Sequence, residues 1–317
     1  MRRKAVSVYL GISLLVLVGL PLAASAVLDD AAICPGTGQE CLVHTRITVT
    51  DPDGIDITHP AGNGGPLTLH ILPGGAIVAN TNPLTPLVIK AGAIVVDSGG
   101  GIIGDVFAGQ GNTITLTTID TAPPAGEAAV VDIHGLMEAS ALRLNGSGGD
   151  GGSISVTSAG PCQIAGRIAT NGSAGTSIGG SGGNISFDCA TVTVNRGALI
   201  DASASGPGGA GGSISLTSEN DGLMLAKGAT LRALGSGIDG GSVSLASNSN
   251  DPAATCTIAS KVLLDAKTVA TVLGPSEGTG GSIDISCGGN IRIQVSPALA
   301  PSFIAWVSGA SSLAVTF

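Results

Sequence analysis

Five copies of one short phrase decide the fold of this chain. They read GGSISVTS from Gly151, GGNISFDC from Gly182, GGSISLTS from Gly211, GGSVSLAS from Gly240 and GGSIDISC from Gly280. The interval between the first four copies is nearly constant, and the interval before the fifth is longer. Self-similarity at such a period is typical of solenoids, in which one supersecondary unit is stacked on copies of itself.

Each copy has the alternating pattern of a strand, in which successive side chains point to opposite faces. The residues on one face are apolar in all five copies: Ile154 and Val156, Ile185 and Phe187, Ile214 and Leu216, Val243 and Leu245, and Ile283 and Ile285. The opposite face carries Ser155, Ser186, Ser215, Ser244 and Asp284. One strand cannot bury its apolar face alone, whereas stacked parallel copies can, and each buried aliphatic side chain then contributes about 1.5–3 kcal/mol. We therefore predict an all-β stack of parallel strands with its apolar face inside.

The composition indicates strands separated by glycine-rich turns and not a disordered chain. The chain has 51 glycines among 317 residues, with 11% charged and 2% aromatic residues, against averages of about 7% glycine and 25% charged residues. A hydrophobic content of 43% is too high for a disordered chain. The glycine-rich loops are therefore interpreted as turns. Two degenerate copies, GGPLTLHI from Gly64 and GNTITLTT from Gly111, extend the predicted stack towards the N-terminus.

The N-terminus has the features of a secretory signal over residues 1–26. These are a basic triplet at residues 2–4, an apolar run at residues 9–22 and an Ala-Ser-Ala cleavage site at residues 24–26. Removing the three basic residues changes the formal charge from −9 to −12. We expect no membrane span in the mature chain. This acidity also argues against nucleic acid as a partner.

The rest of the chain divides into three parts. We predict an irregular N-terminal cap at residues 27–63, stacked repeats at residues 64–290 and a C-terminal cap at residues 291–317.

Six cysteines in an exported chain indicate disulfides, with free buried thiols as the alternative. Two cysteines open similar phrases, CQIAG and CTIAS, and two others each stand at the same place after the paired glycines of the next copy. The same offset thus occurs twice, and each such bond would join adjacent coils. The predicted pairs are Cys162 with Cys189, Cys256 with Cys287, and Cys34 with Cys41 across a small N-terminal loop.

Three aspartates near the N-terminus, Asp51, Asp53 and Asp56, fit either a plain turn or a calcium ligand set. Calcium binds several carboxylate oxygens, but three carboxylates on so short a loop fall short of a full site of about 12 residues. We interpret the segment as a turn. Asp201 and Arg232 stand at equivalent offsets in neighbouring repeats, so we expect an exposed ion pair between coils.

No catalytic motif is present in the sequence. The four histidines have no metal-ligand spacing, and no nucleophile elbow occurs. The densest titratable group is His134 with Asp132 and Glu138, which we interpret as solvated residues of a turn. The sequence therefore predicts no catalytic residue, no cofactor and no metal site.

The GGSISLTS strand, the turns that begin Arg196-Gly197-Ala198 and Lys227-Gly228-Ala229, and the glycine-rich loops resemble the passenger regions of filamentous-haemagglutinin-type and autotransporter adhesins of Gram-negative bacteria. The resemblance covers about residues 64–290. It implies a right-handed parallel β-helix (a solenoid of about 30-residue coils), export to the periplasm, outer surface or extracellular space, and attachment to cells or matrix.

We therefore expect an exported, non-catalytic structural or adhesive protein. Its partners would be a polysaccharide, a cell-surface or matrix ligand, or another copy of the chain. The alternative is a carbohydrate-active enzyme, a polysaccharide lyase or hydrolase, on the same fold. A third hypothesis is ice or mineral binding. The outward column counts against it, because this column is mainly Ser and not a regular array of Thr. An enzyme should bring charged residues together on one groove, whereas an adhesin or a rod should show only Ser, Thr, Asn and Gly there.

Overall fold

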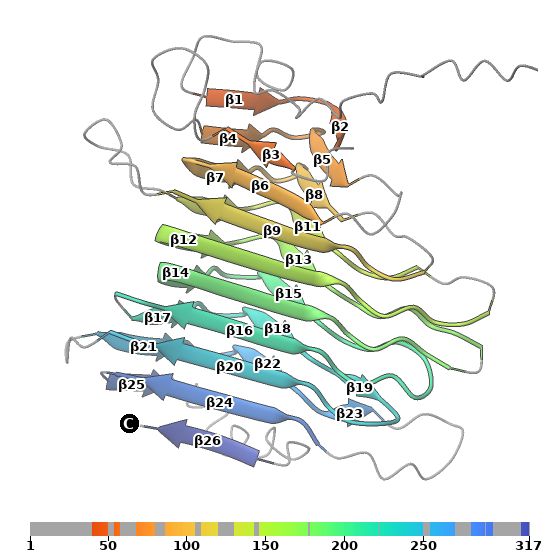
Figure 1. Ribbon diagram of the computed structural model, residues 1–317. Helices are drawn as coiled ribbons and strands as arrows, with labels where there is room; N and C mark the ends of the chain where they lie inside the picture. The colour runs from red at the N-terminus through yellow and green to blue at the C-terminus, as the bar shows by residue number, and fades with distance from the viewer. Residues whose placement is uncertain are drawn as a thin grey trace, which may run out of the picture.

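The computed structural model describes residues 40–49, 54–57, 68–79, 86–104, 109–119, 130–142, 146–176, 178–220, 222–249, 254–269, 280–288, 290–293 and 312–316. All regular secondary structure in these residues is β-strand, and the strands pair in parallel, each with the equivalent strand of the next coil. The predicted all-β parallel solenoid is therefore confirmed (Figure 1). None of these residues belongs to a helix long and apolar enough to cross a bilayer.

The strands of successive coils form three faces, and most coils in the described residues contribute to all three. Face one contains β3 (Ile55–Asp56), β6 (Leu87–Ala91), β9 (Thr113–Thr118), the first half of β12 (Ser153–Ile164), the first half of β14 (Asn184–Val194), β16 (Ser213–Ser218), β20 (Ser242–Ser247), β24 (Ser282–Cys287) and β26 (Ser312–Thr316).

Face two contains β1 (Glu40–Val43), β4 (Thr68–Ile71), β7 (Ala93–Val96), β10 (Val131–Ile133), the second halves of β12 and β14, β17 (Leu223–Leu225), β21 (Thr255–Ile258) and β25 (Asn290–Ile293). Face three contains β2 (Arg46–Val49), β5 (Ala76–Ala79), β8 (Gly101–Ile103), β11 (Leu136–Glu138), β13 (Arg167–Ala169), β15 (Leu199–Asp201), β18 (Thr230–Arg232) and β22 (Leu263–Asp265).

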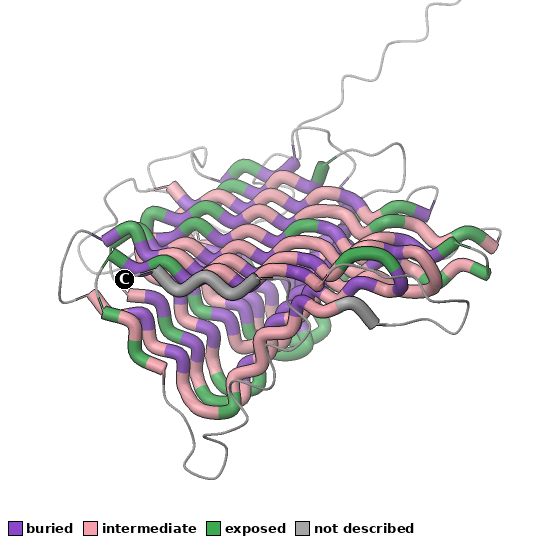
Figure 2. Tube along the Cα trace, turned by 90° about the horizontal axis from the view of Figure 1, so that it is seen from below, coloured by how far each residue is buried: buried purple, intermediate pink, exposed green. Residues whose placement is uncertain are grey.

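The core is the column of apolar side chains that point into the coil. On face one, Ile154 pairs in register with Ile185 and Val156 with Phe187, and all four side chains are buried. The equivalent residues of β16, β20 and β24 continue both ladders and are also buried. Buried and more exposed residues alternate along the strands of face one from β9 to β24 (Figure 2). The predicted inside and outside are therefore both correct.

Coil length varies while strand register is kept. On face three, Ala76 pairs with Gly101 and Gly101 pairs with Leu136, so the second of these coils takes a longer stretch of chain than the first. The loops absorb this difference. The stacking also reaches into the segment that we assigned to a cap, because β1 and β2 pair in register with β4 and β5 of the next coil.

The paired glycines stand where the backbones of successive coils approach one another closely. A Cβ atom on Gly183 would lie 1.8 Å from the Gly152 carbonyl oxygen, and one on Gly212 would lie 1.9 Å from the Gly183 oxygen. A Cβ on Gly241 would lie 2.1 Å from the Gly212 oxygen. No side chain fits at these distances, which is the physical reason for the repeated glycine.

The glycine-rich loops stack on one another instead of only linking strands. Gly179 donates a backbone hydrogen bond to the Pro207 carbonyl at 2.6 Å, and Gly208 donates one to Ser236 at 2.7 Å. The short strands β19 (Gly235–Ser236) and β23 (Thr268–Val269) pair in the same region. The loops therefore continue the coil-to-coil ladder beyond the three faces.

Two predicted disulfides are confirmed. Cys162 is bonded to Cys189 and Cys256 to Cys287, with Cα atoms 6.0 and 6.3 Å apart. All four side chains are buried at the corner between faces one and two, and each bond joins one coil to the next. Cys41 is also disulfide-bonded. Its predicted partner, Cys34, lies outside the described residues.

A buried polar column occupies the same corner. Thr118, Ser158, Ser218 and Ser247 point inward in one ladder with Cys189 and Cys287. The Thr118 hydroxyl donates to Ser158 Oγ at 2.7 Å, and the Ser218 hydroxyl donates to the Ala190 carbonyl at 3.1 Å. These hydrogen bonds offset the cost of burying hydroxyl groups. The two disulfides thus replace serine at two positions of one ladder.

Candidate binding surface

From β9 to β24, the outward side chains of face one form a surface in which small hydroxyl groups predominate, which we call the hydroxyl face. Because β9, β12, β14, β16, β20 and β24 pair in register, their outward residues form three columns that run along the solenoid axis. None of these side chains is buried. The residues are Thr113, Thr115, Thr117, Ser153, Ser155, Thr157, Asn184, Ser186, Asp188, Ser213, Ser215, Thr217, Ser242, Ser244, Ala246, Ser282, Asp284 and Ser286.

The geometry of parallel strands makes this surface a grid. Equivalent residues of neighbouring strands are about 4.8 Å apart, and alternate residues of one strand are about 6.7 Å apart. Neighbouring coils also hydrogen-bond along the first column. Thr113 Oγ1 lies 3.0 Å from Ser153 Oγ, and the Ser213 hydroxyl donates to Asn184 Oδ1 at 2.7 Å. Only Asp188 and Asp284 of the hydroxyl face carry charge.

A groove of about 410 Å³ borders the first column over four successive coils. Its floor consists of the paired glycines, where no side chain fits. Its wall is the first outward residue of each strand: Asn184, Ser213, Ser242 and Ser282. No Asp, Glu, Lys, Arg or His lines this groove. The groove can therefore exchange hydrogen bonds with a ligand but offers no side chain that moves a proton near neutral pH.

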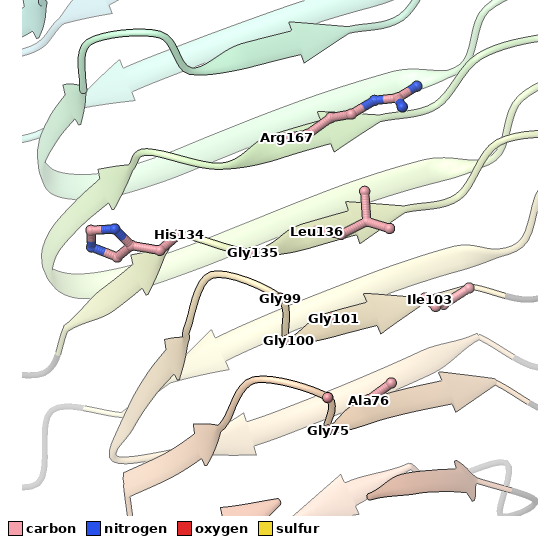
Figure 3. Close-up of a pocket in the computed structure, with 11 residues that line it drawn as sticks. Gly75, Ala76, Gly99, Gly100, Gly101, Ile103, His134, Gly135, Leu136 and Arg167 are labelled. Atoms are coloured by element: carbon pink, nitrogen blue, oxygen red, sulfur yellow. The ribbon is translucent and has the colours of Figure 1, made fainter. Parts of the chain in front are cut away.

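A second hollow of about 480 Å³ lies between faces two and three in the N-terminal half. Its floor includes Gly75, Gly100 and Gly135. Its two titratable residues, His134 and Arg167, lie at opposite ends of the hollow and do not point toward one another (Figure 3). The hollow therefore lacks the converging charged groups that acid–base catalysis needs.

The densest titratable group of the sequence is divided between two faces. Asp132 lies on β10 of face two, and its Oδ1 atom is 3.1 Å from His134 Nε2 in the following turn. Glu138 lies at the end of β11, on face three. The His134 side chain is 47% exposed. The structure therefore brings together Asp132 and His134 and places Glu138 on another face.

An acidic pair at the border of the hydroxyl face was not apparent in the sequence. Burial, the charge of Glu219 and a hydrogen bond with it raise the pKa of Asp188 above its ordinary value. The Asn248 amide of the next coil donates to Glu219 Oε1 at 2.8 Å. The members of the pair belong to successive coils, and only the coil register brings them together.

The predicted ion sites have different outcomes. Asp56 Oδ2 lies 3.7 Å from Lys90 Nζ, while Asp51 and Asp53 lie outside the described residues. No group of three or more His, Cys, Asp or Glu in the described part of the chain is arranged to hold a metal ion.

The interpretation of Asp201 and Arg232 was correct in register and wrong in contact. The two residues are paired between β15 and β18, as expected. The Asp201 carboxylate instead accepts a hydrogen bond from the Ser203 hydroxyl at 2.6 Å and makes no ion pair with Arg232. The carboxylate thus bonds to a hydroxyl two residues further along the chain, just after β15, and an exposed ion pair between coils would contribute only about 0–1 kcal/mol.

Comparison with models of protein families, with curated proteins and with solved structures finds no match to this chain. The class of the protein therefore rests on its fold, which is a parallel β-solenoid. The resemblance to filamentous-haemagglutinin-type adhesins is confirmed for the fold and has no support from a matching family. The two internal disulfides indicate an oxidising environment outside the cytoplasm.

Proposed function

We propose that this protein is an exported, non-catalytic adhesive or structural solenoid whose hydroxyl face and adjoining groove bind an uncharged polysaccharide. The observation that carries the proposal is the groove of four coils lined only by Gly, Ser and Asn. Each hydrogen bond exchanged with water contributes only about 0.5–1.5 kcal/mol net. A grid that repeats the same contact on successive coils can add such contributions along an extended, repeating ligand.

The resemblance to surface adhesins supports export and display on a Gram-negative-type bacterium. The same surface suits self-association or attachment to a matrix. Ice or mineral binding is supported less well. All three outward residues of β9 are Thr, but in the later coils of the hydroxyl face only Thr157 and Thr217 are, and the other positions hold Ser, Asn, Asp or Ala.

The alternative, a polysaccharide hydrolase or lyase, is favoured by one observation, the pair of Asp188 and Glu219. Glycosidases hold two carboxyl groups about 5–5.5 or 6.5–9.5 Å apart, on either side of the bond to be cleaved. Asp188 and Glu219 lie at the border of the hydroxyl face, and neither lines the groove in which a polysaccharide would lie. The pair therefore fits catalysis poorly in this arrangement.

The test is to pass the oxidised chain over columns of neutral and acidic polysaccharides while assaying for released reducing or unsaturated ends. We expect retardation on a neutral polymer without release of ends. Replacing Ser186 and Ser215 together by Glu should abolish retardation, because two charges would be placed on the grid. A matched control, Thr230→Glu on face three, should leave it unchanged. Release of ends by the unmodified chain would contradict the non-catalytic proposal.

A further inference from the structure

One histidine contacts carboxylates of two other coils at the N-terminal end of the solenoid. His70 lies on β4, between β1 of the preceding coil and β7 of the following one (Figure 1). Its Nδ1 atom hydrogen-bonds with Glu40 Oε1 at 2.6 Å, and its Nε2 atom lies 3.1 Å from Asp97 Oδ2. Three successive coils are therefore joined through one imidazole ring.

The contact is diagonal across the strands. His70 is paired in register with Leu42 of β1 and Val95 of β7, so its ring reaches a residue two positions before one partner and two positions after the other. Only 23% of the His70 side chain is exposed, and its Nε2 atom is buried without a hydrogen-bond partner, so the contact with Asp97 is an ion pair and the contact with Glu40 is the hydrogen bond. The side of the ring that faces Asp97 is thus shielded from solvent, whereas the Glu40 side chain is half-exposed.

The two carboxylates require the ring to be protonated. A neutral imidazole carries a proton on one nitrogen only, so its other nitrogen would present a lone pair to a carboxylate. The imidazolium form donates a hydrogen bond to Glu40 and places a positive charge beside Asp97. Within the described residues, neither Glu40 nor Asp97 has another ion-pair partner. Loss of the proton would therefore leave two negative charges uncompensated.

The other charged groups near this point are few. On the next coil, Asp132 follows Val95 in the same ladder and is paired with His134. On the side of the first coil, the nearest titratable residues along the chain are the exposed His44 and Arg46, in the turn after β1 and at the start of β2. Burial lowers the pKa of His70, but the hydrogen bond with Glu40, the contact with Asp97 and the charges of both carboxylates outweigh it and raise the pKa above 6.5.

We propose that protonated His70 is a pH-dependent latch that holds β1 and the first coil onto the two coils that follow. Among the described strands, β1 pairs only with β4, so the latch adds to a single ladder of backbone hydrogen bonds. Because the folded-state pKa is raised, the added stability is fully present below pH 6.5 and is lost as the pH rises through the folded-state value. The latch is independent of the ligand of the hydroxyl face.

The experiment measures amide hydrogen exchange in peptides from β1 and β4 of the full, oxidised chain between about pH 5.5 and 9, corrected for the intrinsic exchange rate. We expect protection of β1 to fall as the pH rises, while β16 and β20 keep theirs. His70→Gln should remove this pH-dependent loss and leave β1 at the low protection of high pH. His134→Gln, at a more exposed histidine with one carboxylate contact, is the matched control and should behave like the unmodified chain.

Two results would overturn the latch. The first is that the protection of β1 in the unmodified chain, corrected for the intrinsic exchange rate, stays constant over the pH range. The other is the same pH-dependent loss in His70→Gln as in the unmodified chain. A proton NMR titration of the His70 ring gives a second readout that does not depend on the variants folding. A pKa at or below 6.5 in the folded chain would exclude the latch.

Discussion

Replacing Gly212 by Ala should separate two coils of the solenoid. A Cβ atom at this position would lie 1.9 Å from the Gly183 carbonyl oxygen, 2.8 Å from the Gly182 carbonyl carbon and 2.9 Å from the Ala202 oxygen. All three atoms are backbone, so no side chain can turn away to make room. Gly183 and its neighbours would have to move.

The required movement sets the size of the effect. Contacts of a Cβ atom rarely fall below about 3.4 Å, so Gly183 and Gly212 must separate by about 1.5 Å. Coils are only about 4.8 Å apart. The shift would break the hydrogen bonds from Ser213 N to the Gly183 oxygen (3.1 Å) and from Gly212 N to the Ala202 oxygen (2.8 Å). Two lost backbone hydrogen bonds and a poorly packed neighbouring core together predict a loss of about 3–5 kcal/mol in the free energy of unfolding.

The assay is urea unfolding of the oxidised chain, followed by circular dichroism. Gly228→Ala is the matched control, because Gly228 has a φ of +82° but no atom within 4 Å of a Cβ. That control should lose only about 1–2 kcal/mol, the cost of a left-handed backbone for an L-residue. If Gly212→Ala lost no more than Gly228→Ala, close approach of the coils would not explain the repeated glycine.

Three further changes test other parts of the molecule. Replacing Cys162 and Cys189 together by Ser should cost about 3.5 kcal/mol in urea unfolding, given a sequence separation of 27 residues; an unchanged midpoint would contradict this. Replacing Val192 and Ser218 together by Cys should form a third internal disulfide, because these residues follow Cys162 and Cys189 in the same two ladders; two free thiols found by mass spectrometry after oxidation would refute the equivalence. Asp188 has a raised pKa, so the folded state binds its proton more tightly and stability falls as the pH rises through its titration. Asp188→Asn should reduce that fall, and an unaltered pH profile of unfolding would argue against it.

Most of the core could be predicted because strand alternation is strict. In the phrase GGSISVTS, the side chains of Ile154 and Val156 must share a face, and five copies at similar spacing leave no other way to bury them. The disulfides could be predicted for a related reason. The two cysteine pairs occupy the same positions within the repeat. Residues at the same repeat position lie at equivalent places in successive coils of a solenoid.

The sequence did not show how many strands each coil has, because the strand on face two has no recurring motif. Only two of its segments share more than one letter, CQI in β12 and CTI in β21, whereas β14 reads VTV and β17 reads LML at this place. Any alternating aliphatic segment satisfies this position. The contacts of His70 were missed because Glu40 lies one coil before it and Asp97 one coil after it, and these coils are unequal in length. The buried Ser158 column did have a signal, because it shares its repeat position with Cys189.

The unequal coil lengths on face three have a consequence for how such a chain can grow. Because each coil contacts only its neighbours, a duplicated segment of about one coil can enter the stack as an additional rung, about 4.8 Å tall, without altering the rungs that already exist. Differences in loop length, such as that between the step from Ala76 to Gly101 and the step from Gly101 to Leu136, do not change the register of the strands. A gene that encodes such a chain can therefore lengthen its product by unequal recombination, and the reach of the molecule is set by the number of copies.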